Sequence, residues 1–105
     1  MEMQTCRHVV LFKFKDDLPE TKVQEIETAF RDLCRGLSFV TAFEWGLNSS
    51  PENLNNGLTH CFLLTFANEH DRDVYLPHPA HLEFCEKYLE GNLDKVCVVD
   101  YLSRY

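Results

Sequence analysis

The amino-acid sequence predicts an α+β fold, with a four-stranded, mainly antiparallel sheet and helices on one of its faces. Four short segments alternate apolar residues with the two-residue period of a strand. Helical periodicity separates them, except that the second and third strands follow each other without a helix between them. The order is therefore β-α-β-β-α-α-β, the ferredoxin-like arrangement, and residues 1–105 are expected to form a single domain.

The first strand is predicted at residues 8–15 and the first helix at residues 19–37. One face of the strand holds four residues, His8, Val10, Phe12 and Phe14. Pro19 and the acids around it indicate a helix start, because proline suits the first turn and acids suit the positive end of the helix dipole. Apolar residues then recur every three or four positions, and Gly36 indicates the stop.

Two strands are predicted next, at residues 39–46 and 58–66, joined by a loop rich in Asn, Ser and Pro. One face of the first of these strands holds Phe39, Thr41, Phe43 and Trp45. One face of the second holds His60, Phe62, Leu64 and Phe66.

The last third of the chain reads as two helices and a strand. Asn68 suits the N-cap of a short helix, which Pro77 stops near Leu76. A second helix starts at Pro79 and closes at Gly91, and residues 93–101 form the last strand.

The sheet has more apolar surface than one layer of helices covers. One face of the sheet is apolar and is expected to pack against the helices. Leu11, Leu63 and Val99 lie on the other face, which is therefore apolar as well. The chain has no spare element to cover this second face, so we expect a second copy of the same sheet, and hence a homodimer.

The charge pattern excludes several partner classes. Ten basic residues against 17 acidic ones give a net charge of −7, with no stripe of Lys or Arg, so neither nucleic acid nor an anionic membrane is expected as a partner. No apolar run is long enough for a membrane helix, and residues 1–5 do not read as a signal peptide. We therefore expect a cytoplasmic protein.

Five cysteines are spread along the chain, an odd number with no C-x-x-C pair: Cys6, Cys34, Cys61, Cys85 and Cys97. They are expected to be small core residues with free thiols, with a nucleophilic or redox cysteine as the alternative. No phosphate loop or dinucleotide fingerprint is present, so no cofactor is expected.

One tyrosine and four histidines are the candidate functional residues: His8, His60, Tyr75, His78 and His81. An imidazole can take a proton next to a carbonyl, and a phenol can stabilise the resulting oxyanion. The alternative is structural, with satisfied core histidines and His78 capping the last helix. The spacing of His78 and His81 also permits a metal pair. A third ligand would have to come from His60 or His8, and no carboxylate is evident to orient the ligands, so no metal is expected.

Five motifs carry a resemblance to a known family: residues 8–15, Phe43-Glu44-Trp45-Gly46, Gly57-Leu58-Thr59-His60, His78-Pro79-Ala80-His81 and Val98-Val99-Asp100-Tyr101. The chain resembles the stress-responsive dimeric α/β-barrel (Dabb) family. The resemblance implies a ferredoxin-like monomer that pairs sheet to sheet into a barrel. One characterised member is a polyketide cyclase that needs no metal or cofactor. By motif position, its catalytic Tyr and His resemble Tyr75 and His81, and its two strand histidines resemble His8 and His60.

Two functions follow from these observations. The first is a stress-responsive homodimer whose His- and Tyr-lined apolar pocket binds a small organic ligand, with His8, His60 and His78 as substrate-binding residues. The second is a polyketide cyclase-like enzyme for aldol-type ring closure on a polyketide-like ligand. In it His81 is the acid or base, and Tyr75 is the oxyanion donor.

Overall fold

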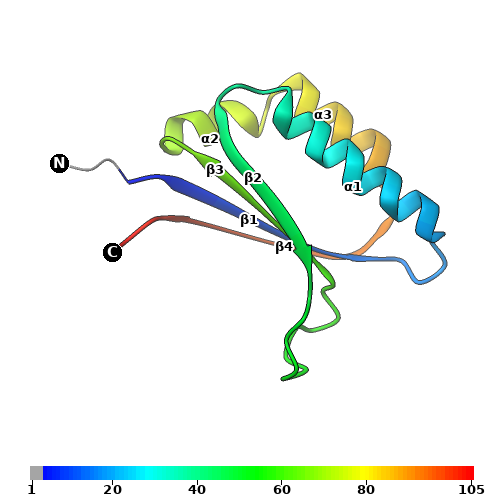
Figure 1. The fold of residues 1–105 in the computed structure, drawn as a ribbon. Helices are drawn as coiled ribbons and strands as arrows, with labels where there is room; N and C mark the ends of the chain where they lie inside the picture. The colour runs from blue at the N-terminus through cyan, green and yellow to red at the C-terminus, as the bar shows by residue number, and fades with distance from the viewer. Residues whose placement is uncertain (1–3) are drawn as a thin grey trace.

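The computed structural model describes residues 4–105 and has the predicted order of elements (Figure 1). The strands are β1 (Cys6–Phe14), β2 (Val40–Leu47), β3 (His60–Phe66) and β4 (Leu93–Leu102). The helices are α1 (Glu20–Arg35), α2 (Glu69–Tyr75) and α3 (Pro79–Phe84), and α3 runs on into a π-helical turn, η1 (Cys85–Leu89). The ferredoxin-like α+β fold is thus confirmed. The prediction that residues 1–5 are not part of a signal peptide rests partly on Met1 to Met3, which lie outside the described residues.

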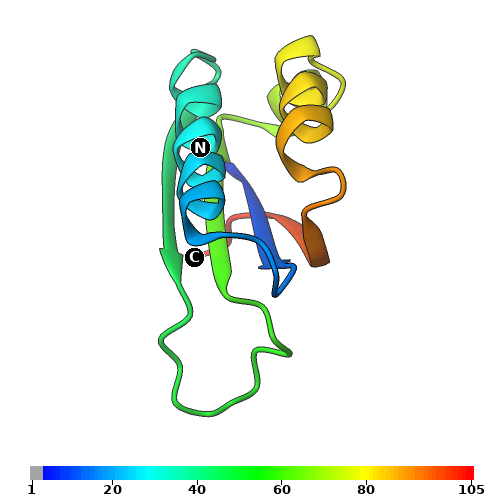
Figure 2. The ribbon, with the colours of Figure 1, turned by 90° about the vertical axis from the view of Figure 1, so that its right-hand side faces the viewer.

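The four strands form one antiparallel sheet in the order β2-β3-β1-β4. All three helices lie on the same face of it, α1 beside the α2–α3 pair (Figures 1 and 2). β1 is paired on both sides, and His8 lies directly opposite Leu64 of β3 and Asp100 of β4. Phe12 in turn lies opposite His60, so the two strand histidines face the helices from opposite ends of the sheet.

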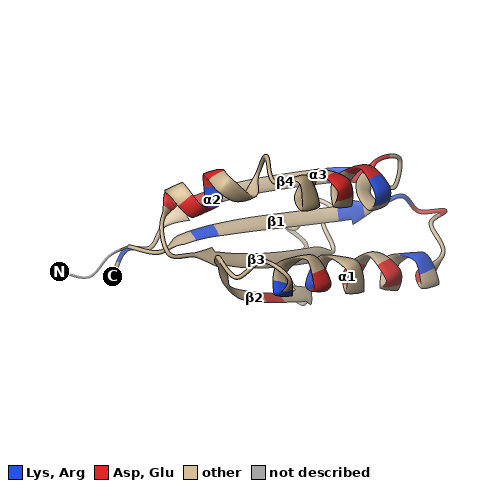
Figure 3. Ribbon diagram, turned by 90° about the horizontal axis from the view of Figure 1, so that it is seen from above, with Lys and Arg blue, Asp and Glu red and all other residues tan. Residues whose placement is uncertain are grey.

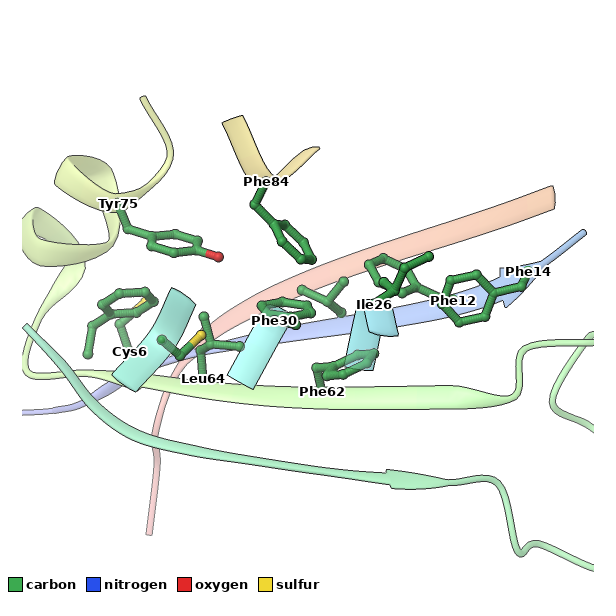
Figure 4. Close-up of a cluster of buried hydrophobic side chains, with 12 residues drawn as sticks. Cys6, Phe12, Phe14, Ile26, Phe30, Phe62, Leu64, Tyr75 and Phe84 are labelled. Carbon is green, nitrogen blue, oxygen red and sulfur yellow. The ribbon is translucent and has the colours of Figure 1, made fainter. Parts of the chain in front are cut away.

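The core lies between the sheet and the helices (Figure 4). Burial alternates strictly along β1, as the predicted face requires, and α1 contributes Ile26, Phe30 and Cys34. The phenyl ring of Phe30 stacks on that of Phe62 with 4.5 Å between centroids. Each fully buried large apolar side chain stabilises the fold by about 1.5–3 kcal/mol.

The predicted helix ends are mostly confirmed. Pro19 is the N-cap of α1, and the backbone of Gly36 closes its last turn. The side chain of Asn68 accepts a hydrogen bond from the backbone N–H of Asp71 and so caps α2. Gly91 has φ +81°, a conformation that glycine adopts without strain, and it ends the last helical segment. The π-helical turn after Phe84 was not predicted.

β2 differs from the prediction in its start and in its faces. It begins at Val40, and its register with β3 shifts between Val40 and Ala42. The extra residue of this bulge breaks the two-residue alternation. Thr41 is therefore exposed, with its hydroxyl donating to the backbone carbonyl of Thr65, whereas Phe43 packs on Phe30.

The second face of the sheet is open and apolar. Leu11 and Leu63 are half-buried there, and Val99 and Tyr101 are exposed. Seen from the helix side, most of the charged residues lie on the helices and near the strand ends (Figure 3). Among residues 4–105, no helix has the length and apolar character that crossing a membrane requires.

Candidate functional site

Tyr75 and His81 meet at the junction between α2 and α3. Tyr75 is the last residue of α2, and His81 lies in the first turn of α3, after the Pro77-His78-Pro79 connection. Their ring centroids are 4.4 Å apart, with 41° between the ring planes. Because the prolines stop α2 and restrict the backbone before α3, the junction brings these two side chains together.

His78 caps α3 within this junction. Its Nδ1 accepts a hydrogen bond of 3.1 Å from the backbone N–H of Ala80, and its ring packs 5.9 Å from that of Phe39. The capping contact that the structural alternative predicts is therefore present, and ligand binding by His78 stays a prediction. Residues 4–105 contain no group of three or more His, Cys, Asp or Glu side chains placed to hold a metal ion.

His81 has a defined protonation state. Its Nδ1 lies 2.8 Å from the carbonyl oxygen of Leu76. Because that oxygen can only accept, Nδ1 carries the proton and Nε2 of the neutral ring keeps its lone pair. Burial lowers the pKa of His81; the Leu76 hydrogen bond partly offsets this, and the charges of His8 and His78 lower the pKa further. His81 is thus a neutral imidazole near pH 7, with Nε2 able to act as a base.

The hydroxyl of Tyr75 is a buried polar atom without a hydrogen-bond partner among the residues that the structure describes. The side chain is completely buried, and its hydroxyl points away from α2 into the core (Figure 4). Burial raises the pKa of Tyr75, and the nearby Cys34 and Cys85 thiols raise it further. The phenol is therefore a protonated donor with no acceptor, an arrangement that costs about 1–3 kcal/mol when nothing is bound.

His8 forms the sheet side of this cluster. Its Nδ1 lies 2.6 Å from Oδ1 of Asp100, and the other carboxylate oxygen of Asp100 accepts a 3.1 Å hydrogen bond from Arg72. The ring of His8 stands edge-on to that of Tyr75, with 5.8 Å between centroids. The interactions link β1, β4 and α2 and so fix the orientation of the His8 ring.

His60 lies apart from this cluster. It is separated by four residues along β3 from Leu64, the partner of His8, which corresponds to roughly 13 Å. Its Nε2 lies 2.7 Å from a carboxylate oxygen of Glu27, and its Nδ1 lies 2.8 Å from the hydroxyl of Thr59. The indole of Trp45 stacks on its ring at 5.9 Å. Both ring nitrogens are thus occupied by the protein.

Cys85 separates His81 from a surface groove. Its Sγ lies 3.4 Å from Nε2 of His81, within hydrogen-bond reach for sulfur. The groove has a volume of about 570 Å³, and its lining is largely apolar: Leu82, Cys85, Glu86, Leu89, Glu90 and Leu93. An apolar group in this groove therefore contacts Cys85, whose sulfur in turn contacts the base.

Sequence reasoning missed three charged residues that hold the histidines, namely Glu27, Arg72 and Asp100. Glu27 lies on α1 and Arg72 on α2, where charges usually face solvent. Asp100 did carry a signal, since it interrupts an apolar strand that must pair with a neighbour. The pairing of β4 with β1 was needed to place it opposite His8.

The fold and the site define a small ferredoxin-like α+β protein with a buried Tyr–His pair. The chain belongs to the stress responsive A/B barrel domain (Dabb) family, whose model matches residues 6–103. It is 41% identical over 95 residues to the stress-response A/B barrel domain-containing protein HS1 of Arabidopsis thaliana. The matched segment covers 90% of this chain and 86% of that protein.

The chain also resembles an enzyme. It is 28% identical over 98 residues to olivetolic acid cyclase of Cannabis sativa, with 93% of this chain and 96% of that protein covered. Among solved structures, At3g17210 of Arabidopsis thaliana has a TM-score of 0.89 at 39% identity, over 95% of this chain and 96% of that one. A ferredoxin-like protein of Bacteroides fragilis, described as dimeric, has a TM-score of 0.71 at 26% identity, over 94% and 96%.

Proposed function

We propose that this protein binds a small organic carbonyl compound where Tyr75 and His81 meet. The observation that carries the proposal is the hydroxyl of Tyr75, a buried donor that lies beside a neutral imidazole and has no hydrogen-bond partner in the described part of the chain. A carbonyl oxygen is its natural acceptor, because a protonated phenol donates one hydrogen bond. The apolar groove beside Cys85 supplies contact for the hydrocarbon part of such a ligand.

The predicted substrate-binding histidines take different parts in this proposal. His8 orients the ligand from the sheet side, with Asp100 holding its ring. His78 shapes the junction through its cap and contacts the ligand from there. His60 stabilises the opposite end of the core and is left out of the contact with the carbonyl group, because both of its nitrogens have partners.

Aldol-type ring closure is a second candidate function. The 28% identity to olivetolic acid cyclase and the free lone pair on Nε2 of His81 support it. In this reaction Nε2 removes a proton from the carbon between two carbonyls, and Tyr75 donates to the enolate oxygen. The carbanion attacks a distant carbonyl of the same chain, and the protonated imidazole returns the proton to the new alkoxide. These steps use only residues of the chain.

The test of both functions uses a linear 3,7-dioxoalkanoyl thioester of N-acetylcysteamine, in which attack of C2 on the C7 carbonyl closes a six-membered ring. We expect saturable binding by titration calorimetry, weakened at least about tenfold in Tyr75→Phe, the equivalent of one lost hydrogen bond in a buried site. If the protein is also a cyclase, liquid chromatography with mass detection resolves the ring product from the linear substrate of equal mass, and His81→Gln slows its formation by about 10²–10⁴-fold. Cys97→Ser, on the other face of the sheet, is the control. Binding unchanged in Tyr75→Phe contradicts the proposal.

We propose in addition that the protein is a homodimer that pairs through the open face of its sheet. The exposed apolar side chains of Val99 and Tyr101 support this, as does the dimeric relative from Bacteroides fragilis. Sedimentation velocity is expected to show a dimer that Val99→Lys dissociates, because an unpaired charge would be buried at the interface. Leu54→Lys, in the exposed β2–β3 loop, is the control. A monomeric wild type contradicts this proposal.

We also propose that residues 1–105 form a single domain and that the protein is located in the cytoplasm. The supporting observation is that all five cysteines are free thiols, as expected in a reducing compartment.

A further inference from the structure

Cys85 combines accessibility with a neighbouring base. Cys6 and Cys34 are buried, and Cys61 and Cys97 are exposed on the open face of the sheet. Cys85 is half-buried, lines the groove and has an imidazole nitrogen 3.4 Å from its sulfur.

The backbone fixes the direction of this contact. His81 and Cys85 are four residues apart, so they share one face of the helical segment. Because Nδ1 of His81 donates to the carbonyl of Leu76, the lone pair of Nε2 faces the sulfur. The thiol is therefore the donor in this pair, and its proton has a path to the imidazole.

Electrostatics keeps the pair neutral at rest. Burial raises the pKa of the Cys85 thiol and lowers that of His81. A thiolate is therefore formed only while a reaction takes place, as the proton moves to Nε2. A reagent that reacts only with a preformed thiolate is expected to label Cys85 slowly. An electrophile that accepts both the sulfur and, afterwards, the proton held by His81 is suited to this pair.

The hydroxyl of Tyr75 is the second, independent observation. It is completely buried and has no hydrogen-bond partner among residues 4–105. His81 links it to the thiol, because Nε2 of His81 lies 3.4 Å from the sulfur of Cys85. The ring of Tyr75 also lies 4.4 Å from that of His81. A carbonyl oxygen bound to this hydroxyl places the rest of its ligand beside the base and the thiol.

We infer that Cys85, His81 and Tyr75 form an addition site for α,β-unsaturated carbonyl compounds. The sulfur forms a bond to the β-carbon, and the electrons of the carbon–carbon double bond move toward the carbonyl oxygen, to which Tyr75 donates. The thiol proton passes to Nε2 of His81 and then to the α-carbon. The thioether product contains every atom of both reactants, so no oxidant or cofactor is needed. The inference rests on the proposed function for the contact between carbonyl and Tyr75.

The test compares two reagents at one cysteine. Wild-type protein is treated at neutral pH with hexyl vinyl ketone or with iodoacetamide, and peptide mass spectrometry gives the labelling rate of Cys85. Glutathione serves as the reference thiol. The ratio of the ketone rate to the iodoacetamide rate is expected to be at least about tenfold higher for Cys85 than for glutathione, since general-base assistance contributes at least that much.

Variants separate this site from ordinary thiol reactivity. Tyr75→Phe keeps the ring and is expected to lower the ratio at Cys85 toward that of glutathione, and His81→Gln is expected to do the same. Cys85→Ser abolishes the adduct, whereas Cys97→Ser retains it. A ratio equal to that of glutathione, or one unaffected by Tyr75→Phe, overturns the inference. Thioester binding without a Cys85 adduct overturns only this inference, and an adduct without thioester binding overturns only the proposed function.

Discussion

The two ends of the core contain similar side chains in different states. At the His60 end, a histidine lies among aromatic rings, and both of its nitrogens bind protein groups, one of them the carboxylate of Glu27. At the Tyr75 end, a phenol and an imidazole also lie among aromatic rings, but no group of residues 4–105 forms a hydrogen bond with the phenol. The difference lies in the partners, because α1 supplies Glu27 and β2 supplies Trp45 to the His60 end.

The difference in hydrogen bonding indicates that the His60 end stabilises the fold and that the Tyr75 end serves binding. A buried polar group that has its hydrogen bonds contributes to folding, whereas one without them costs free energy. The His60 end therefore has the properties of a structural core. The Tyr75 end keeps a costly unpaired donor, which is the pattern of a site that sacrifices stability for binding.

The largest effect is expected where the two ends meet. Phe62 is completely buried and stacks on Phe30. Phe62→Ala should lower the free energy of unfolding by about 3–5 kcal/mol, because it leaves a cavity that rigid aromatic neighbours cannot fill. Urea denaturation at matched protein concentration measures this change. A loss below about 1 kcal/mol would mean that the core collapses around the cavity.

A smaller loss is expected at the His60 end. Glu27→Ala removes the partner of Nε2 and should cost about 1–3 kcal/mol, because a buried nitrogen is left unpaired. Glu25→Ala, on the exposed side of the same helix, is the matched control and should change stability by less than about 0.5 kcal/mol. Equal effects of the two variants would show that the His60 end is not held in this way.

Acid should act on the Tyr75 end through His81. Its pKa is lowered below the ordinary 6.5 in the folded protein, so the unfolded chain binds the proton first as pH falls. Wild type should therefore lose stability below about pH 6.5, and His81→Gln should lose less over the same range. Urea midpoints at several pH values measure this difference. A steeper acid loss in the variant contradicts the lowered pKa.

The fold was largely predictable because local chemistry determined its elements. Asn68 caps α2, and the alternation along β1 puts His8 and Phe12 in the core, all from neighbouring residues. The bulge at Thr41 and the π-helical turn after Phe84 were missed. Each inserts one residue into a regular repeat, and tertiary packing rather than local sequence decides where such an insertion is tolerated.

The candidate site was predictable in its residue types and only in part in its geometry. The prolines around His78 indicated a fixed junction, and Tyr75 and His81 do meet there. Which histidines lie near them could not be read from alternation, because His8 and His60 share one predicted face. The distance between the two histidines depends on the register between β1 and β3. The hydrogen-bond partner of His8 is Asp100, which lies 92 residues away in the sequence.

The unfolding of Tyr75→Phe tests the central claim most directly. The substitution keeps the ring and removes only the buried hydroxyl. If that hydroxyl is unpaired and kept for a ligand, the free energy of unfolding without ligand should be unchanged or higher, at matched protein concentration. A loss of about 1–3 kcal/mol would show that the hydroxyl is hydrogen-bonded within the fold, and would contradict the account of Tyr75 as the donor of a binding site.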